Sequence, residues 1–195
     1  SGGFAEYWSI IRRERLLQGG FIWDWRDQGI LREKSADHPL TVAQAAVAAL
    51  DPVRFVSPAG TLRYFAYGGD YGDKPNDNNF CFNGVVGADL KPNPHAVEIA
   101  HQYRNLHVSG VDLTSAQPRV KVLNEHFFTT VEGQPYRWAV REDGRVLRTG
   151  KGRLPAIAPQ ATAELVLDLP RIKARPGAEY HLDLEFLQGV KRPWA

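Results

Sequence analysis

Apolar side chains recur at helical spacing near the start of the chain. Their intervals are i, i+3, i+4 and i+7, which mark one face of an amphipathic helix: Phe4, Tyr7, Trp8 and Ile11. The pattern predicts a helix over residues 3–17. Gly19 and Gly20 then end it, because consecutive glycines disfavour continued helix.

Two short runs further along the chain have the character of strands. Phe21–Trp25 is aromatic and β-branched, which predicts a buried strand, and Arg63–Tyr67 predicts another. Between them, the alanine-rich piece Val42–Leu50 lies between two prolines and predicts a short helix inside an insertion.

The stretch from Gly68 to Gly84 is crowded with Gly, Asp and Asn and has no periodicity. A loop of this length is too long for an idle connection, so it is a candidate functional site. Pro92-Asn93-Pro94 then introduces a predicted helix over residues 94–105. Its apolar stripe consists of Ala96, Ile99, Ala100 and Tyr103.

The second half of the chain has the period of two that is typical of strands. Examples are Arg119–Val122 and Leu165–Leu169, and Asp143-Gly144 carries the signal of a tight hairpin. Short strands at this spacing predict an immunoglobulin-like β-sandwich. We therefore expect an α/β domain over residues 1–105 and an all-β, truncated domain over residues 106–195.

Composition and charge argue against several classes of protein. The formal net charge is only +2, and the densest basic cluster, residues 12–15, is interrupted by Glu14 at the predicted helix end. We expect no nucleic-acid partner, because no basic face continues from it. No apolar run approaches the ~18 residues of a membrane span, so we expect no membrane partner either.

Cys81 is the only cysteine, which excludes a disulfide within the chain and fits a reducing compartment such as the cytoplasm. The chain contains no methionine, and its first residue is serine. We therefore expect both ends to be cuts within a longer protein.

Two segments, Gln18–Gln28 and Tyr67–Gly84, combine aromatic rings with carboxylates and carboxamides. A sugar presents an apolar face to a flat ring and a rim of hydroxyls to Asp, Asn or Gln, so both segments suit a carbohydrate site. The alternative is that the aromatic residues belong to a core and that the polar ones form Asx turns. Asp70 and Asp73 in particular suit the capping of backbone amides.

Neither segment contains a carboxylate pair that can be named acid and nucleophile, which a glycosidase requires across the scissile bond. The six histidines show no spacing typical of metal ligands.

Residues 2–28 resemble the family 2 β-galactosidases, which have a Gly-Gly-Phe helix followed by Gln-Gly-Gly-Phe-x-Trp-Asp-Trp-x-Asp-Gln. Residues 67–84 resemble their Tyr-Gly-Gly-Asp-x-Gly-Asp-x-Pro-Asn-Asp-x-x-Phe-Cys-x-Asn-Gly loop, and residues 92–102 resemble the helix that closes their barrel. The resemblance implies the C-terminal portion of a (β/α)8 TIM barrel, followed by the sandwich. It makes the strand around Trp23 the eighth of the barrel.

The resemblance also implies roles for individual residues. Trp23 matches the tryptophan that lies against galactose, and Asn83 matches a direct sugar contact. The Phe80 carbonyl and the Asn83 side chain match ligands of a monovalent cation, Na⁺ or K⁺, and Asn76 matches the asparagine of a Mg²⁺-associated site. Oxygen ligands suit these hard cations.

The implied activity is hydrolysis of terminal, non-reducing β-D-galactosides with retention, through a glycosyl-enzyme. The resemblance places both catalytic carboxylates outside these 195 residues, so the isolated chain is expected to be inactive. Its implied partners are a β-galactoside, the remaining domains of the parent chain and identical subunits of that parent.

The chain departs from the family pattern at three places. Asn78 stands where arginine is common, Phe82 stands where methionine is usual, and the segment 31–62 is longer than expected. That segment is either a peripheral decoration, which we favour, or a part of the pocket. Two alternative functions remain: a noncatalytic carbohydrate-binding module, and another family 2 glycosidase such as a β-glucuronidase or β-mannosidase.

Overall fold

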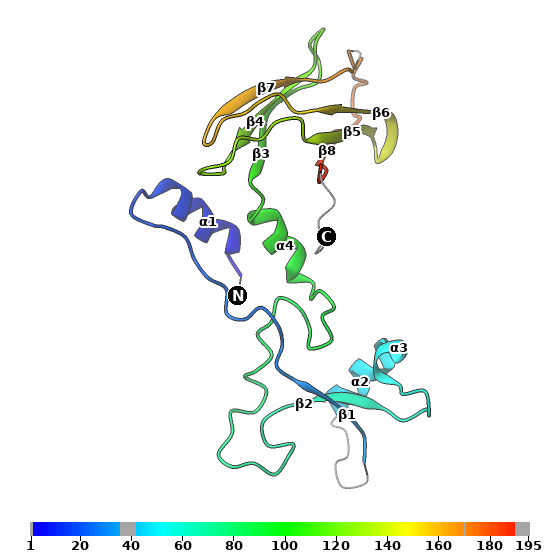
Figure 1. Cartoon of the computed structure of the whole chain (residues 1–195). Helices are drawn as coiled ribbons and strands as arrows, with labels where there is room; N and C mark the ends of the chain where they lie inside the picture. Colours follow the sequence, from blue (N-terminus) through cyan, green and yellow to red (C-terminus); the bar gives the residue numbers. More distant parts are fainter. Residues whose placement is uncertain (1, 36–41, 170, 190–195) are drawn as a thin grey trace. The chain divides into compact units, whose positions relative to one another are not determined.

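The computed structural model describes residues 2–35, 42–169 and 171–189. The chain divides into two compact units, Ser1–Tyr103 (unit 1) and Arg104–Ala195 (unit 2). Sheet strands dominate the fold, with few helices among them (Figure 1). In the described part of the chain, no helix has both the length and the apolar character needed to span a membrane.

Unit 1 contains four helices and a two-stranded sheet among its described residues. In chain order they are α1 (Phe4–Arg13), β1 (Ile30–Glu33), α2 (Val42–Leu50), α3 (Pro52–Phe55), β2 (Arg63–Ala66) and α4 (His95–Gln102). The predicted helices at 3–17, 42–50 and 94–105 are confirmed, the first and last with shorter bounds. Helix α1 ends at Arg13 because Glu14 turns to an extended conformation.

The predicted strand over residues 21–25 is wrong. In the part of the chain that the structure describes, this segment lies outside any strand, and only Arg26 forms a single parallel bridge, with Val86. A ladder needs a partner along its whole length, whereas the backbone bonds here join residues 24–27 to residues 83–86 only. The aromatic composition predicts an extended segment, but it does not determine whether another segment pairs with it.

The predicted strand at Arg63–Tyr67 is confirmed as β2, which pairs antiparallel with β1. Helices α2 and α3 connect the two strands, and their buried residues Ala48 and Phe55 accompany Tyr64 and Ala66 of β2. Residues 36–41 of this insertion lie outside the described residues. The insertion therefore has a small apolar core of its own.

One ion pair ties the insertion to the loop ahead of α4. Arg54 of α3 donates from Nη2 to Asp89 Oδ1 at 2.7 Å. Partial burial is the largest single influence and acts to raise the pKa of Asp89, but the hydrogen bonds from Arg54 and the backbone and the charge of Arg54 together hold the pKa below its ordinary value.

The described residues of unit 2 form two three-stranded antiparallel sheets (Figure 1). One has the order β3-β4-β7, formed by Leu106–Asp112, Arg119–Asn124 and Thr162–Val166. The other has the order β6-β5-β8, formed by Arg145–Arg153, Pro135–Glu142 and Tyr180–Phe186. Alternate residues of β4 and β5 are buried, among them Val120, Val122, Tyr136, Trp138 and Val140.

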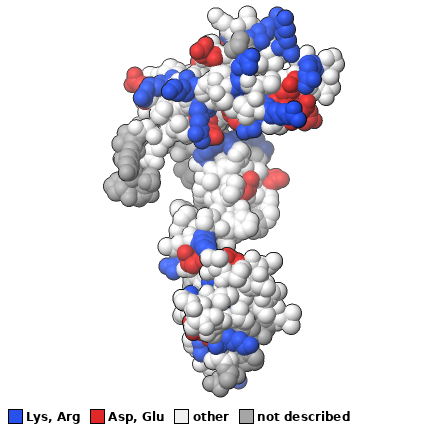
Figure 2. All heavy atoms as spheres, turned by 90° about the vertical axis from the view of Figure 1, so that its right-hand side faces the viewer, with Lys and Arg blue, Asp and Glu red and all other residues white. Residues whose placement is uncertain are grey.

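The predicted hairpin at Asp143-Gly144 is confirmed between β5 and β6. Asp143 has φ 48° and Gly144 has φ 79°, so both central residues adopt the left-handed conformation that such a turn requires. On the outer face of the same sheet, Arg137 pairs with Glu185 and Arg141 with Asp183. Figure 2 accordingly shows basic and acidic side chains interspersed over its upper part.

Candidate functional site

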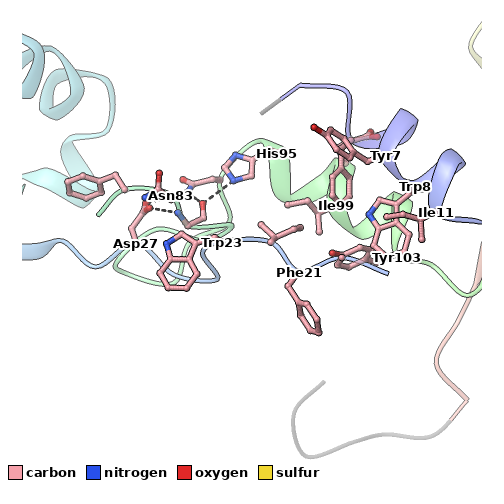
Figure 3. Close-up of a pocket in the computed structure, with 17 residues that line it drawn as sticks. Tyr7, Trp8, Ile11, Phe21, Trp23, Asp27, Asn83, His95, Ile99 and Tyr103 are labelled. Atoms are coloured by element: carbon pink, nitrogen blue, oxygen red, sulfur yellow. Dashed lines mark hydrogen bonds between the residues drawn. The ribbon is translucent and has the colours of Figure 1, made fainter. Parts of the chain in front are cut away.

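Unit 1 contains a cavity of about 600 Å³ between α1, the segment 20–27, the loop 82–84 and the start of α4 (Figure 3). One end is aromatic: the rings of Trp8 and Tyr103 meet edge to face with centroids 4.9 Å apart, and Phe4 contacts both. Burial raises the pKa of the Tyr103 hydroxyl. This end of the cavity holds α1 against α4.

The other end of the cavity holds the two residues predicted to contact sugar, Trp23 and Asn83, with Asp27 and His95 beside them (Figure 3). Trp23 is 80% exposed, so a ligand can reach its side chain. Trp25 is 67% exposed but does not line the cavity. The structure therefore distinguishes two tryptophans that the sequence places only two positions apart.

A series of backbone hydrogen bonds brings Trp23 and Asn83 together. Asp24 N donates to Asn83 O at 3.0 Å, and Val85 N donates back to Asp24 O at 3.0 Å. The series continues from Val86 N to Trp25 O and from Asp27 N to Val86 O. The two polar and aromatic segments noted in the sequence thus meet through their main chains.

The Asn83 side chain turns back onto its own loop. Its Nδ2 donates to the main-chain oxygen of Phe80, so the two groups predicted to bind a monovalent cation are adjacent. The Phe80 ring, by contrast, is exposed. Phe80 does not line the cavity, and its carbonyl is connected to it only through the Asn83 side chain.

Asn76 lies outside the lining of the cavity. Its Nδ2 donates to Asp73 O at 2.8 Å, and its Oδ1 accepts from Asn78 N at 3.1 Å. Asn78 has φ 52°, a left-handed conformation that asparagine tolerates better than most residues. Among the described residues, no cluster of three or more His, Cys, Asp or Glu side chains could hold a metal ion.

Two acidic residues of the loop 68–84 cap backbone amides, as the sequence suggested. Asp70 Oδ2 accepts from Tyr67 N at 2.9 Å, and both carboxylate oxygens of Asp73 accept from Gly69 N. Asp24 is engaged similarly, with Trp25 N and the Gln28 side chain. These carboxylates shape the loops that carry the site.

Three residues of the site received no role from the sequence: Asp27, Asn93 and His95. All three line the cavity and bond the main chain of Gly84. Asn93 and His95 flank Pro94 at the start of α4, and nothing in their spacing pointed to residue 84. Only the return of the chain across the segment 24–27 brings them there.

The insertion between 31 and 62 contributes none of its described residues to the lining of the cavity. Its strand β1 pairs with β2 and its helices contact each other and β2. This arrangement favours a peripheral decoration.

The comparisons with known proteins cover both units. Residues 1–108 match the family model described as glycosyl hydrolases family 2, TIM barrel domain, and residues 120–195 match the model described as β-galactosidase, domain 4. The predominance of sheets with few helices is consistent with the end of such a barrel and a following sandwich.

Relatives align with the whole of the chain. It is 34% identical to "Beta-galactosidase 2" of Enterobacter cloacae, 35% identical to a β-galactosidase of Aeromonas hydrophila and 34% identical to one of Klebsiella pneumoniae. Each alignment covers 100% of this chain and 16% of the relative, so the chain spans about a sixth of their length. By the match over residues 1–108, the chain belongs to glycosyl hydrolase family 2.

Proposed function

We propose that this chain is part of a β-galactosidase that hydrolyses terminal, non-reducing β-D-galactosides with retention. Residues 1–105 are then the C-terminal part of the (β/α)8 barrel, and residues 106–195 belong to the immunoglobulin-like sandwich that follows. The observation that carries the proposal is the meeting of Trp23 and Asn83 at one end of a single cavity. An exposed aromatic residue next to a carboxamide suits a sugar, which has both an apolar face and hydroxyls.

The fit of a monovalent cation rests on Asn83 and Phe80. The nitrogen and oxygen of a carboxamide differ by a rotation of the amide plane, so a half-turn of the Asn83 amide would bring Oδ1 beside the Phe80 carbonyl oxygen. Two neighbouring oxygens are the ligands that Na⁺ and K⁺ prefer. A cation held there would supply positive charge to the 6-hydroxyl of the galactosyl group.

Asn76 is the residue that the proposal associates with Mg²⁺. The Asn76 carboxamide already bonds its own loop through both of its polar atoms. Its oxygen keeps a second lone pair, which is the one group it could offer to a metal-bound water or to the ion. Asn76 is therefore proposed to take part in a magnesium site through its Oδ1 alone.

The chemistry assigned to the chain is binding and orientation. Asp24 and Asp27 accept hydrogen bonds from backbone amides next to the proposed sugar platform, which occupies their oxygens. The nucleophile and the acid required for retention are expected to come from residues outside these 195. Within the chain, Trp23 lies against the sugar ring and Asn83 contacts both sugar and cation.

Substituting Asn83 tests this proposal through ion dependence. In the full-length enzyme, Asn83→Ala is expected to raise the half-activating Na⁺ concentration by about tenfold or more, because one cation ligand is lost. Asn83→Asp keeps an oxygen and adds negative charge, so its half-activating concentration should lie closer to that of the wild type. The measurement is activity against Na⁺ concentration at constant ionic strength with choline chloride.

Asn79→Ala is the matched control, because Asn79 is an exposed asparagine of the same loop. Its activation curve should superimpose on that of the wild type. If Asn83 only held a turn ahead of Gly84, both Asn83 variants would lose stability with no change in ion dependence. Superimposable curves for all variants would remove Asn83 from the cation site.

A further inference from the structure

We infer that Asp27, Asn93 and His95 are positioning residues for Asn83, acting through the main chain of Gly84. This inference rests on the proposed role of Asn83 in binding sugar and cation. The three side chains, called here the Gly84 clamp, come from two separate parts of unit 1: the segment after Trp23 and the residues that introduce α4. None of them is assigned a contact with substrate.

The clamp satisfies both polar groups of Gly84. The N–H donates to Asp27 Oδ1 at 2.7 Å, and the carbonyl accepts from Asn93 Nδ2 at 2.9 Å. His95 Nε2 lies 2.9 Å from the same carbonyl, so it must carry a proton to bond there. Asn93 and Asp27 also face each other, with Nδ2 and Oδ2 3.4 Å apart. The dashed lines of Figure 3 mark bonds of this group.

Gly84 itself is buried and has no room for a side chain. A Cβ at this position would clash with backbone atoms of Arg26, Asp27 and Val86. The two main-chain segments therefore approach as closely as glycine alone permits. The polar groups of residue 84 must be satisfied by side chains that reach it from elsewhere, because a buried, unpaired amide or carbonyl is costly.

Holding Gly84 fixes the direction of the Asn83 side chain. The peptide group between residues 83 and 84 is held at both ends: its oxygen accepts from Asp24 N at 3.0 Å, and its N–H donates to Asp27. With that plane held, the Cα of Asn83 is fixed in place, so its amide can approach the Phe80 oxygen from one position only. Asn93 and His95 hold the next peptide group through the Gly84 carbonyl, which keeps the plane from shifting.

The same bonds connect the clamp to the sugar platform. Asp24, whose N–H holds the Asn83 oxygen, directly follows Trp23 in the chain. A loosened Gly84 should therefore alter the distance between the platform and the Asn83 amide. The expected consequence is weaker binding of the cation and the sugar, which a purely structural role in unit 1 would not produce.

The test compares His95→Gln with His95→Leu in the full-length enzyme. Both side chains are of similar size, but only glutamine can donate a hydrogen bond to the Gly84 carbonyl. The half-activating Na⁺ concentration is expected to rise about five- to tenfold in His95→Leu and to stay within about twofold of wild type in His95→Gln. Val97→Ala, an exposed position two residues along α4, is the control and should match the wild type.

A second readout does not depend on turnover. Na⁺ that binds the folded enzyme should raise its Tm relative to choline chloride at equal ionic strength. This increment should shrink in His95→Leu and be restored in His95→Gln. If His95→Leu fails to fold, Asp27→Asn takes its place as the test. The asparagine keeps an oxygen that can accept from Gly84 N. The carboxylate oxygen that faces Asn93 Nδ2 is replaced by an amide group, which is a weaker acceptor or none. Asp27→Asn is expected to raise the half-activating Na⁺ concentration and reduce the Tm increment.

The possible outcomes separate this inference from the proposed function. In one outcome, Asn83→Ala changes both the half-activating Na⁺ concentration and the Tm increment, while the variants of His95 and Asp27 lower only the Tm measured without Na⁺. The Gly84 clamp is then purely structural, and the inference is overturned. The assignment of Asn83 then stands. If Asn83→Ala changes neither readout, the proposed cation site is wrong and the inference fails with it.

Discussion

Replacing Trp23 by alanine in the full-length enzyme is expected to lower kcat/KM for an aryl β-galactoside by roughly 30- to 900-fold. This range corresponds to about 2–4 kcal/mol of transition-state binding, the scale for losing a large aromatic platform. The reason is the position of Trp23, which is 80% exposed, at the cavity end that also holds Asn83. The measurement is steady-state kinetics on purified wild type and variant.

Trp25→Ala is the matched control for this substitution. Trp25 has the same side chain two positions along and lies outside the lining of the cavity. Its loss is expected to lower the Tm, while kcat/KM per folded molecule stays close to that of the wild type. Unchanged kinetics and stability for Trp23→Ala, together with a large kinetic loss for Trp25→Ala, would show that the platform is the other tryptophan.

Asn124→Ala is expected to destabilise the β-sandwich region by about 2–4 kcal/mol. The Asn124 side chain is 0% exposed, and its Nδ2 lies within hydrogen-bond distance of the carbonyl oxygens of Thr129, Ile157 and Ala158. Its Oδ1 accepts from His126 N at 3.1 Å. Alanine would remove the partner of His126 N and of the Thr129 oxygen, each at a cost of about 1–3 kcal/mol, whereas the Ile157 and Ala158 oxygens keep their bonds from Val131 N and Ala161 N.

Hydrogen exchange of the full-length protein measures this loss where it occurs. Peptides over residues 119–131 and 154–166 should exchange roughly 30-fold faster or more in Asn124→Ala, which corresponds to about 2 kcal/mol. Thr130→Ala, an exposed position near the same loop, should exchange as the wild type does. Equal protection in Asn124→Ala would mean that these bonds contribute little to stability.

Periodicity predicted most of the regular elements because each depends on local side-chain pattern. The stripe from Phe4 to Ile11, the alanine-rich α2 and the Asp143-Gly144 turn carry their signal within a few residues. The segment 21–25 does not, because a strand also requires a distant segment that pairs with it along its length. Its composition is that of a strand, but its bonds within the described residues run to 83–86 alone.

The site was predictable in part. The resemblance to the family 2 β-galactosidases pointed to Trp23 and Asn83 in two separate segments, and both line one cavity in the structure. Asp27, Asn93 and His95 were missed because their roles lie in the contact with Gly84, which joins residues 57, 9 and 11 positions apart. No local pattern encodes such a contact, since it depends on how the chain returns across its earlier segment.

The most direct test of the central claim is the substrate preference of the full-length protein. We expect kcat/KM for an aryl β-D-galactoside to exceed the values for the matching β-D-glucuronide and β-D-mannoside by roughly 100-fold or more, because a site that bonds the galactosyl hydroxyls leaves polar groups unpaired with other sugars. The isolated chain of 195 residues, assayed beside it, is expected to show no turnover. A preference for the glucuronide or the mannoside, or binding of galactosides by a full-length protein that hydrolyses none of them, would contradict the assignment.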